Sequence, residues 1–585
     1  MVTKFISNLG LDPLPIRHAF AGYGPDGIRR DVRAGVNGAL LAFPQAIAYA
    51  MLAGLPIQYG IWCSAIAALV GPLFVSSRLT ILGPTNATAV MMLSISLGMP
   101  QGAENAGVLA LLVCMVGGLL IAGAFMQLAF LLRFISQSVI IGYICAAALL
   151  IIANQMQHVL GVEVDRGSTF LDIAKKTAVH LPETQWQSVV LAIFAFSIQM
   201  ILQRRFKMWP GVAISLVLTA CLAASMRWQG VEVGMVAALP DGHWPLTLPT
   251  LNFSTFQSLL GPAIALAFLA ALENTIMAKT VASRTGTDLN PNQDLMGLGV
   301  ANLASGLTSG MVASASPVRS SLNIDSNAFG PLSSIINGAL CVAGALLLGS
   351  AIGLLPKAAV AAVVVGAAIS LLDMRRVRVA WKSTRSDAVT LATTFIAALI
   401  APLDTAIFIG VATSIALFLK KASAPQLIEY SFNDDGQLCE VEDRRSNPRI
   451  SIIHAEGDLF FGASDLFRDE VRKVCKDPLL RVVVLRLRNA HHLDATTIFA
   501  IEDLIRYLQS TGRFLLISGA RRDVYKIFRD TGVLDLLDKK NFFMGSPSNP
   551  NLATRKALKR AQELIGSEKA DIQIYYDPNK KKREE

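Results

Sequence analysis

Charged residues are scarce in this chain. Asp, Glu, Lys and Arg make up 16% of its 585 residues, and hydrophobic residues make up 53%. Soluble domains carry about 25% charge. No charged side chain occurs between Arg33 and Arg78, and the stretches 105–132 and 134–162 are similarly apolar. Because a membrane-crossing helix needs about 20 apolar residues, these stretches predict an α-helical polytopic membrane protein in a lipid bilayer.

Cysteines are also scarce, and their positions indicate no particular chemistry. The chain has seven cysteines, and five of them lie in apolar stretches. None forms a C-x-x-C pair or stands at ligand spacing from a histidine, so neither a disulfide framework nor a metal site is expected. No catalytic triad, phosphate-binding loop or G-x-G-x-x-G motif is apparent, and we expect neither an enzyme nor a bound cofactor. The first 33 residues contain no apolar segment typical of a signal peptide.

The net charge of +10 comes from basic residues in short loops, which argues against a nucleic-acid partner. Such loops face the cytoplasm in most membrane proteins. We therefore expect a multi-pass protein of the plasma (inner) membrane with a cytoplasmic N-terminal segment, 1–30. The connection 227–254 is poor in basic residues and should lie outside. The loops expected in the cytoplasm contain Arg29, Arg30 and Arg33; Arg204, Arg205 and Lys207; and Arg375, Arg376, Arg378, Lys382 and Arg385.

Two apolar segments contain residues that typically start a helix. One reads Gly83-Pro84-Thr85-Asn86-Ala87-Thr88, and the other reads Ala315-Ser316-Pro317-Val318-Arg319-Ser320-Ser321. Pro is favoured in the first turn of a helix, and the residue before it resists helix. Each segment therefore predicts a half-helix that begins inside the membrane. Paired broken helices at matching positions of two halves indicate the substrate site of a transporter.

Helix N-termini carry free N–H groups and a positive dipole end, which suits an anion. The residues that we expect to bind it at the two half-helices are Thr85, Asn86, Ala87, Ser316, Arg319 and Ser320. Thr85 and Asn86 could instead simply cap their helix, and the two roles are compatible. Arg319 adds a full positive charge, although it could also be a snorkelling side chain or a structural partner of Glu273.

Glu273 follows an uncharged run, and an acid within a span costs roughly 2.5–3.5 kcal/mol on insertion scales. It therefore needs a function, a partner or a proton. A protonated glutamate is easier to bury, so Glu273 is predicted to be a proton-coupling group. The alternative is a structural pair with Arg319 or Lys279.

The composition changes at Lys421, after which an ordinary soluble character begins. Short β-rich runs at 449–454, 481–487 and 514–517 alternate with helical patterns at 463–475, 496–509 and 522–529, which predicts an α/β domain. We assign 31–421 to the membrane part and 422–566 to this domain. The tail, 567–585, is strongly charged and is predicted to be disordered.

Several long motifs resemble one family. The stretch FPQAIAYAMLAGLP at 43–56 resembles the first span of the SulP anion permeases, the solute carrier 26 family. The stretch at 272–303 is similar to its eighth and ninth spans, with Asn292-Gln293-Asp294-Leu295 in place of N-Q-E-L. The C-terminal region resembles the STAS domain of these permeases, with Asp494-Ala495-Thr496 at its loop-to-helix turn. The resemblance implies about fourteen spans as two inverted seven-span repeats, a core and a gate, a cytoplasmic STAS domain and a homodimer.

The resemblance also implies roles for single residues. Gln45 and Tyr49, four apart after Pro44, are expected to face the substrate, and Glu273 stands where many members place a coupling acid. Sodium-coupled members have a hydroxyl one turn later, where this chain has Met277. A thioether is a poor sodium ligand, which favours protons. The serine that usually precedes the family's arginine is Val318 here.

Together these observations predict a secondary active transporter of a small inorganic or carboxylate anion. Sulfate is the first choice, with bicarbonate or a dicarboxylate next, coupled to protons and moved by an elevator-type mechanism. The alternatives are an uncoupled anion channel or exchanger, and a membrane-anchored regulator that acts through a cytoplasmic protein partner at the STAS domain. Phosphorylation of Thr496 is a further open possibility.

Overall fold

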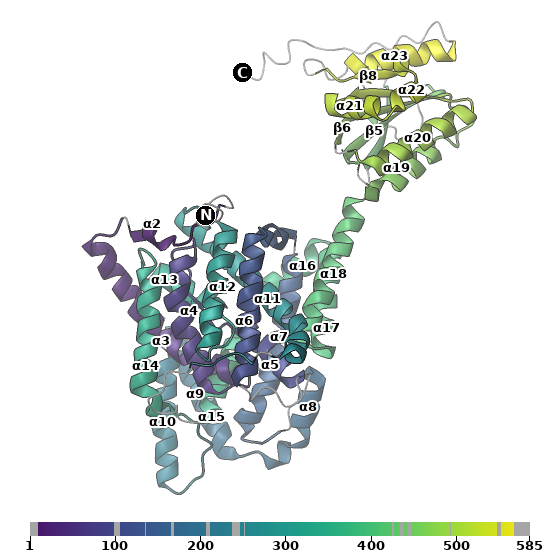
Figure 1. Ribbon diagram of the computed structural model, residues 1–585. Coiled ribbons are helices and arrows are strands. Elements are labelled where there is room, and N and C mark those ends of the chain that lie inside the picture. Colours follow the sequence, from purple (N-terminus) through teal and green to yellow (C-terminus); the bar gives the residue numbers. More distant parts are fainter. Residues whose placement is uncertain are drawn as a thin grey trace. The chain divides into compact units, whose positions relative to one another are not determined.

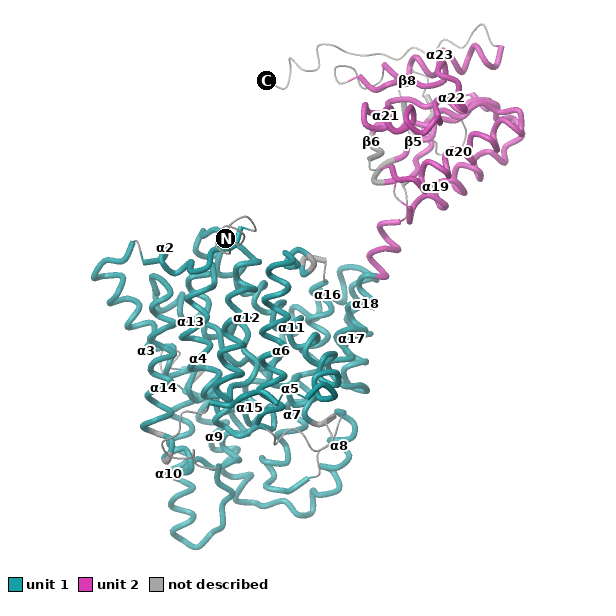
Figure 2. The backbone as a smooth tube through the Cα atoms, in the orientation of Figure 1, with its two compact units in different colours: residues 1–415 teal, residues 416–585 magenta. Residues whose placement is uncertain are grey.

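The computed structural model describes residues 10–20, 22–98, 106–134, 136–164, 169–205, 211–236, 246–250, 252–423, 426–432, 438–440, 447–459, 461–491, 493–546 and 552–566. The chain divides into two compact units, 1–415 and 416–585, coloured separately in Figure 2. The predicted tail, 567–585, lies outside the described residues. The expected boundary at 421 stays a prediction.

Unit 1 is helical (Figure 1), and among the described residues eight of its helices are long and apolar enough to cross a membrane. Two successive sets of helices make up most of it. The first set is α3 (Pro25–Leu52), α4 (Ile57–Phe74), α5 (Asn86–Gly98), α6 (Ala106–Phe125), α7 (Gln137–Leu160), α9 (Trp186–Arg205) and α10 (Gly211–Trp228). The second set is α11 (Phe253–Thr285), α12 (Pro291–Leu307), α13 (Pro317–Asp325), α14 (Leu332–Ile352), α15 (Lys357–Leu371), α17 (Arg385–Ile400) and α18 (Leu403–Ala422).

The two sets pack as an inverted repeat. The short half-helix is the third member of each set, α5 in the first and α13 in the second. Each contact between the sets recurs when equivalent helices of the two sets are swapped. The second helix of each set packs on the fourth of the other (α4 on α14, α12 on α6), and so does the first (α3 on α14, α11 on α6). Likewise α9 packs on α15 as α17 packs on α7. The predicted repeat of seven and seven helices, with a broken helix in each half, is therefore confirmed.

Smaller elements connect these helices. They are α2 (Ile16–Phe20), α8 (Phe170–Val179), α16 (Met374–Ser383), the 3₁₀ turns η1 (Leu128–Phe134) and η2 (Leu181–Glu183), and the strands β1 (Leu82–Gly83) and β2 (Ser314–Ala315). Close helix contacts depend on small residues, as is common in membranes. A Cβ on Gly117 of α6 would lie 2.8 Å from the carbonyl oxygen of Gly299 on α12. Only glycine allows these two backbones to approach so closely.

Unit 2 contains a sheet of six strands in the order β4-β3-β5-β6-β7-β8. The strands β5 (Ile450–Asp458), β6 (Val482–His491), β7 (Phe514–Ala520) and β8 (Phe542–Met544) are parallel, and β3 (Gln426–Phe432) and β4 (Leu438–Glu440) add an antiparallel edge. The helices are α19 (Phe461–Val474), α20 (Ala495–Ser510), α21 (Arg522–Asp530), α22 (Val533–Leu537) and α23 (Leu552–Ile565), with a short 3₁₀ turn, η3 (Lys539–Asn541).

Alternating strand residues form two cores, one on each face of this sheet. Ile453, Val483 and Ile517 pack with α19 to α22, whereas Ile452, Val484 and Leu516 pack with α23. This period of two is why the buried strands could be recognised from sequence. The three predicted strands and three predicted helices are present, within a few residues of their expected bounds. Strands β3, β4 and β8 and helix α23 were not predicted.

Candidate functional site

The two half-helices begin at one place in unit 1. Their leading strands pair in antiparallel register, Leu82 with Ala315 and Gly83 with Ser314. The Ser316 N–H donates to the carbonyl oxygen of Ile81 at 3.1 Å, and the Ile81 N–H donates to Oγ of Ser320 at 3.0 Å. The chain leaves this small sheet in opposite directions to form α5 and α13. The predicted pairing of the broken helices is thus a direct hydrogen-bonded contact.

Side chains cap both half-helices. Thr85 and Thr88 form a reciprocal pair, in which each backbone N–H donates to the other's hydroxyl, at 3.1 and 3.2 Å. Ser316 is the N-cap of α13 and accepts from the Arg319 N–H at 3.4 Å. The capping role weighed for Thr85 is therefore present, and the cap by Ser316 was not predicted. Caps satisfy only some of the free N–H groups at a helix start.

The uncapped N–H groups are the ones available to a ligand. Within the described residues, the backbone N–H groups of Asn86 and Ala87 on α5 have no acceptor, and neither has that of Val318 on α13. The side chains of these three residues differ in their exposure. Ala87 is buried, Asn86 is half-buried, and Val318 is 54% exposed. The valine side chain at 318 therefore points out of the site, and only its backbone can contribute there.

Arg319 lies on α13 and is the largest fully buried side chain of the described residues, at 0% exposure. Its Nη1 donates to Oγ of Ser64 at 2.9 Å and its Nη2 donates to the carbonyl oxygen of Pro84 at 2.6 Å. A guanidinium carries five N–H donors. Its Nε has no partner in the structure. Arg319 thus joins the second half-helix to the start of the first and keeps three N–H groups for another acceptor.

Gly83 makes room for this guanidinium. A Cβ at position 83 would lie 2.6 Å from Nη1 and 2.8 Å from Nη2 of Arg319. No side chain can be that close to a planar, buried guanidinium without displacing it. The glycine of the first segment therefore has a steric role as well as a place in the turn.

Glu273 lies on α11, beside the start of α5. Its Oε2 accepts a hydrogen bond from the Thr85 hydroxyl at 2.8 Å. Within the described residues it forms no ion pair with Arg319 or Lys279, the structural partners weighed from the sequence. Nearby, the Ser314 hydroxyl donates to the Ala270 carbonyl at 3.0 Å and fixes α11 against β2. Glu273 is thus connected to the first half-helix through Thr85, the residue that caps that helix.

Gln45 and Tyr49 lie on α3, which packs against both half-helices. Tyr49 is buried, and it is near enough to Arg319 and Glu273 to interact electrostatically with both. Gln45 is half-buried, and its enclosed Oε1 has no partner. The predicted residues of α3, α5, α11 and α13 therefore gather around one location, although the sequence placed them in four separate spans.

Three neighbouring residues were not predicted. Ser64 holds the guanidinium, Thr88 completes the cap of α5, and Tyr143 on α7 is fully buried with an unpartnered hydroxyl. The spacing of Thr85 and Thr88 is that of a capping box and could have been recognised. A serine and a tyrosine in apolar spans give no comparable signal.

The Asn292-Gln293-Asp294-Leu295 motif forms a clamp away from this location. Asp294 Oδ1 accepts from the N–H groups of Ser76 and Ser77, at 2.7 and 3.0 Å. The Gln293 amide donates to the carbonyl oxygens of Phe74 and Asp12. These bonds fix the start of α12 against the connection between α4 and β1.

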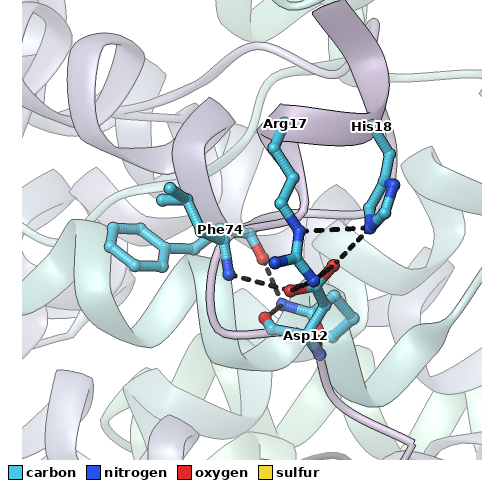
Figure 3. Close-up of polar contacts among 6 residues, drawn as sticks. Asp12, Arg17, His18 and Phe74 are labelled. Atoms are coloured by element: carbon cyan, nitrogen blue, oxygen red, sulfur yellow. Dashed lines mark hydrogen bonds and ion pairs between the residues drawn. The ribbon is translucent and has the colours of Figure 1, made fainter. Parts of the chain in front are cut away.

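The N-terminal segment is bound at the same clamp. Figure 3 shows the carboxylate of Asp12 between Arg17 and His18, beside Phe74. Asp12 is 3.2 Å from Nη2 of Arg17 and 3.1 Å from Nε2 of His18. Gly10 and Asp12 of the N-terminal segment are therefore held at the start of α12.

In unit 2, Asp494 is the N-cap of α20. It accepts from the N–H and the hydroxyl of Thr497, both at 2.9 Å, and from the Phe461 N–H. Partial desolvation acts to raise the pKa of Asp494, but these hydrogen bonds outweigh it and leave the pKa below its usual value. Thr496 is exposed at the second position of the helix. Among the described residues no group of acids, cysteines and histidines could hold a metal ion.

Comparison with known proteins decides the family. Residues 28–394 match the sulfate permease family, and residues 443–546 match the STAS domain. This chain belongs to the sulfate permease family. Within that family it is 27% identical, over 548 residues, to a probable sulfate transporter of Mycobacterium tuberculosis, covering 90% of this chain and 96% of the relative. It is 26% identical to the sodium-independent sulfate anion transporter of Bos taurus, with 87% of each chain covered.

Solved structures support the same fold. The inward-facing murine solute carrier 26 family member A9, an anion transporter, superposes with a TM-score of 0.84 at 20% identity, covering 96% of this permease and 95% of that chain. The transmembrane domain of the cyanobacterial bicarbonate transporter BicA superposes with a TM-score of 0.59 at 19% identity, covering 67% and 98%. The permease is thus a multi-pass membrane protein with an α/β STAS domain.

Proposed function

We propose that this permease is a secondary active transporter that binds a small anion, sulfate first, between the starts of α5 and α13. The observation that carries the proposal is the set of unused donors there. Arg319 has three N–H groups without an acceptor, and Asn86, Ala87 and Val318 contribute unpaired backbone N–H groups. Buried donors normally have partners. An oxyanion would supply acceptors to all of them.

Electrostatics favours an anion over a neutral solute. Two helix starts and one buried guanidinium place positive charge on one location, and no carboxylate of the described residues pairs with Arg319. A guanidinium binds oxyanions with two parallel hydrogen bonds, and these are among the stronger ones in proteins. Sulfate has four acceptor oxygens, enough to engage donors from both half-helices at once. The names of the two relatives, a probable sulfate transporter and a sulfate anion transporter, agree with this choice.

Glu273 is proposed as the proton-coupling residue. Its carboxylate accepts from Thr85, the cap of the half-helix that would hold the anion. A charged carboxylate at this position repels an incoming anion, whereas a protonated one does not. Binding of the anion and of the proton would then favour each other. This reciprocity is the thermodynamic requirement for coupling.

Alternating access is proposed to occur by an elevator-type movement of a core that contains both half-helices. The pairing of β1 with β2 and the bond from Arg319 to Pro84 tie α5 and α13 together, so they would move as one body. A cytoplasmic STAS domain and N-terminus, a plasma-membrane location and a homodimer complete the proposal. The sidedness follows the basic loops: Arg375 and Arg376 lie near the start of α7, whereas Arg227 and Glu232 lie near its other end.

Uptake of labelled sulfate into proteoliposomes, with and without an inward proton gradient, tests this function. We expect accumulation above equilibrium only with the gradient. Gradient-independent equilibration would support the uncoupled exchanger or channel, and a channel would also give large currents. The absence of any flux would favour the regulator acting through its STAS domain. Competition with bicarbonate and dicarboxylates at equal concentration ranks the substrates.

A further inference from the structure

Helix α16, between α15 and α17, has the composition of a helix that lies at a membrane surface. It reads Met374-Arg-Arg-Val-Arg-Val-Ala-Trp-Lys-Ser383. On a helical projection, Met374, Val377 and Trp381 share one side, and Arg375, Arg378 and Lys382 share the adjacent side. Met374 and Trp381 are exposed, with Trp381 at 56%. An apolar side that ends in tryptophan, next to a basic side, is typical of interfacial helices.

The acidic residues around α16 are already engaged. Asp373 accepts from the N–H groups of Arg375 and Arg376 and forms an ion pair with Arg376. Asp387 accepts from the hydroxyls of Thr384 and Ser138, at 2.8 and 2.9 Å. Within the described residues, the side chains of Arg375, Arg378, Lys382 and Arg385 have no carboxylate partner. The surface therefore presents a surplus of positive charge.

A cavity of about 490 Å³ adjoins this basic side. It is lined by Arg375, Arg376 and Ser383 of α16, by Ser136 to Ser138 at the start of α7, and by Asp373 and Asp387, whose carboxylates are engaged by the hydrogen bonds and the ion pair given above. It thus combines cationic side chains with hydroxyl and amide donors, on the helix that also carries the exposed Trp381. The chemistry that fits all three is a phosphate group joined to acyl chains.

We propose that α16 and this cavity bind the headgroup of an anionic phospholipid of the adjacent leaflet, with Trp381 and Met374 among its acyl chains. Anionic lipids are concentrated on the side of the membrane to which the basic loops are assigned above. Because α16 packs on α7 and α17, a bound lipid would hold these helices at the interface. The site is separate from the half-helices and takes the lipid whether or not the protein transports sulfate.

The test uses the full-length protein and native mass spectrometry with phosphatidylglycerol and phosphatidylcholine as probes. The parent should retain phosphatidylglycerol selectively. The variant Arg375→Gln/Arg378→Gln/Lys382→Gln should lose affinity for it by about fivefold for each charge removed. The matched control is Arg555→Gln/Lys556→Gln/Lys559→Gln, which removes the same charge from exposed positions of α23 and should bind as the parent does.

Three results would overturn the proposal. The first is undiminished retention of phosphatidylglycerol by the α16 variant, and the second is an equal loss in the α23 control. The third is displacement of the lipid by inorganic phosphate at matched concentration, which would show a site for free anions. Trp381→Ala keeps every charge and provides a second check. It should weaken binding of phosphatidylglycerol while leaving the cavity's affinity for a short-chain, soluble analogue unchanged.

Discussion

Arg319 donates a hydrogen bond to the carbonyl oxygen of Pro84, 235 residues earlier in the chain, at 2.6 Å. This bond connects the two broken helices through a single buried side chain. Arg319 thus holds the half-helices together, and under the proposed function it also offers its remaining donors to an anion; mutation can separate these two roles.

Arg319→Ala should weaken sulfate binding by roughly 1.5–3 kcal/mol, the range for hydrogen bonds to charged groups. Arg319→Lys should recover part of this loss, because it keeps the charge but not the planar fork. The measurement is calorimetry of the purified variants. Ser64→Ala removes one of the hydrogen bonds that orient the guanidinium, and it should weaken sulfate binding by less than either Arg319 variant does. Parental affinity in Arg319→Ala would assign the site to backbone N–H groups alone.

Glu273→Gln should bind sulfate but fail to accumulate it under a proton gradient. Glutamine keeps the size and can still accept from the Thr85 hydroxyl, yet it cannot exchange a proton. Paired measurements of binding and of proteoliposome uptake, at matched reconstitution, check this. If pH-driven uptake were unchanged, the coupling proton would have to be carried elsewhere.

Thr85→Val should reduce stability and alter transport together, because one hydroxyl both caps α5 and bonds to Glu273. Loss of an N-cap costs about 1 kcal/mol. Thr85→Ser keeps the hydroxyl and is the matched control. Thr85→Phe should block sulfate sterically and spare a smaller anion such as chloride. Thermal unfolding in detergent and anion competition distinguish the effects.

Gly83→Ala should weaken sulfate binding about as much as Arg319→Ala does, although it adds a single methyl group, because its Cβ would lie 2.6 Å from Nη1 of Arg319 and would displace the guanidinium. The control is Gly118→Ala on α6, where an added Cβ meets nothing within 4 Å. Both variants should reach the membrane in similar amounts. Equal sulfate affinity in the two would show that the guanidinium can rearrange without loss of the site.

Asp494→Ala should make the start of α20 less stable at neutral pH, by about 1 kcal/mol for a lost N-cap. The pKa of Asp494 is lower in the folded protein than its usual value. Its contribution is therefore present above the unfolded pKa of about 3.9 and disappears as the pH falls through the lower, folded value. Hydrogen exchange of the α20 amides in the full-length protein should show a difference at pH 7 that shrinks in acid.

The sequence was sufficient for those features that depend on local rules. Proline and cap residues predicted the starts of α5 and α13, and the period of two predicted the buried strands of unit 2. The sequence could not show which residues contact one another across the fold. Nothing local distinguishes Ser64 from other serines in apolar spans, or shows that Thr85 rather than Arg319 contacts Glu273. Likewise the motif at 292–295 was recognised by resemblance, and its bonds to Ser76, Ser77 and the N-terminal segment required the fold.

The pairing of β1 with β2 also has a consequence for how the protein is made. Leu82 pairs with Ala315, and the intervening chain must be synthesised before they can meet. At the usual speed of translation, about 5–20 residues per second, this takes on the order of ten to fifty seconds. During that time α5 is in the membrane without its partner, and Gly83 has no guanidinium to accommodate. The proposed anion site can therefore form only after the whole first set of helices, α11 and α12 have been synthesised.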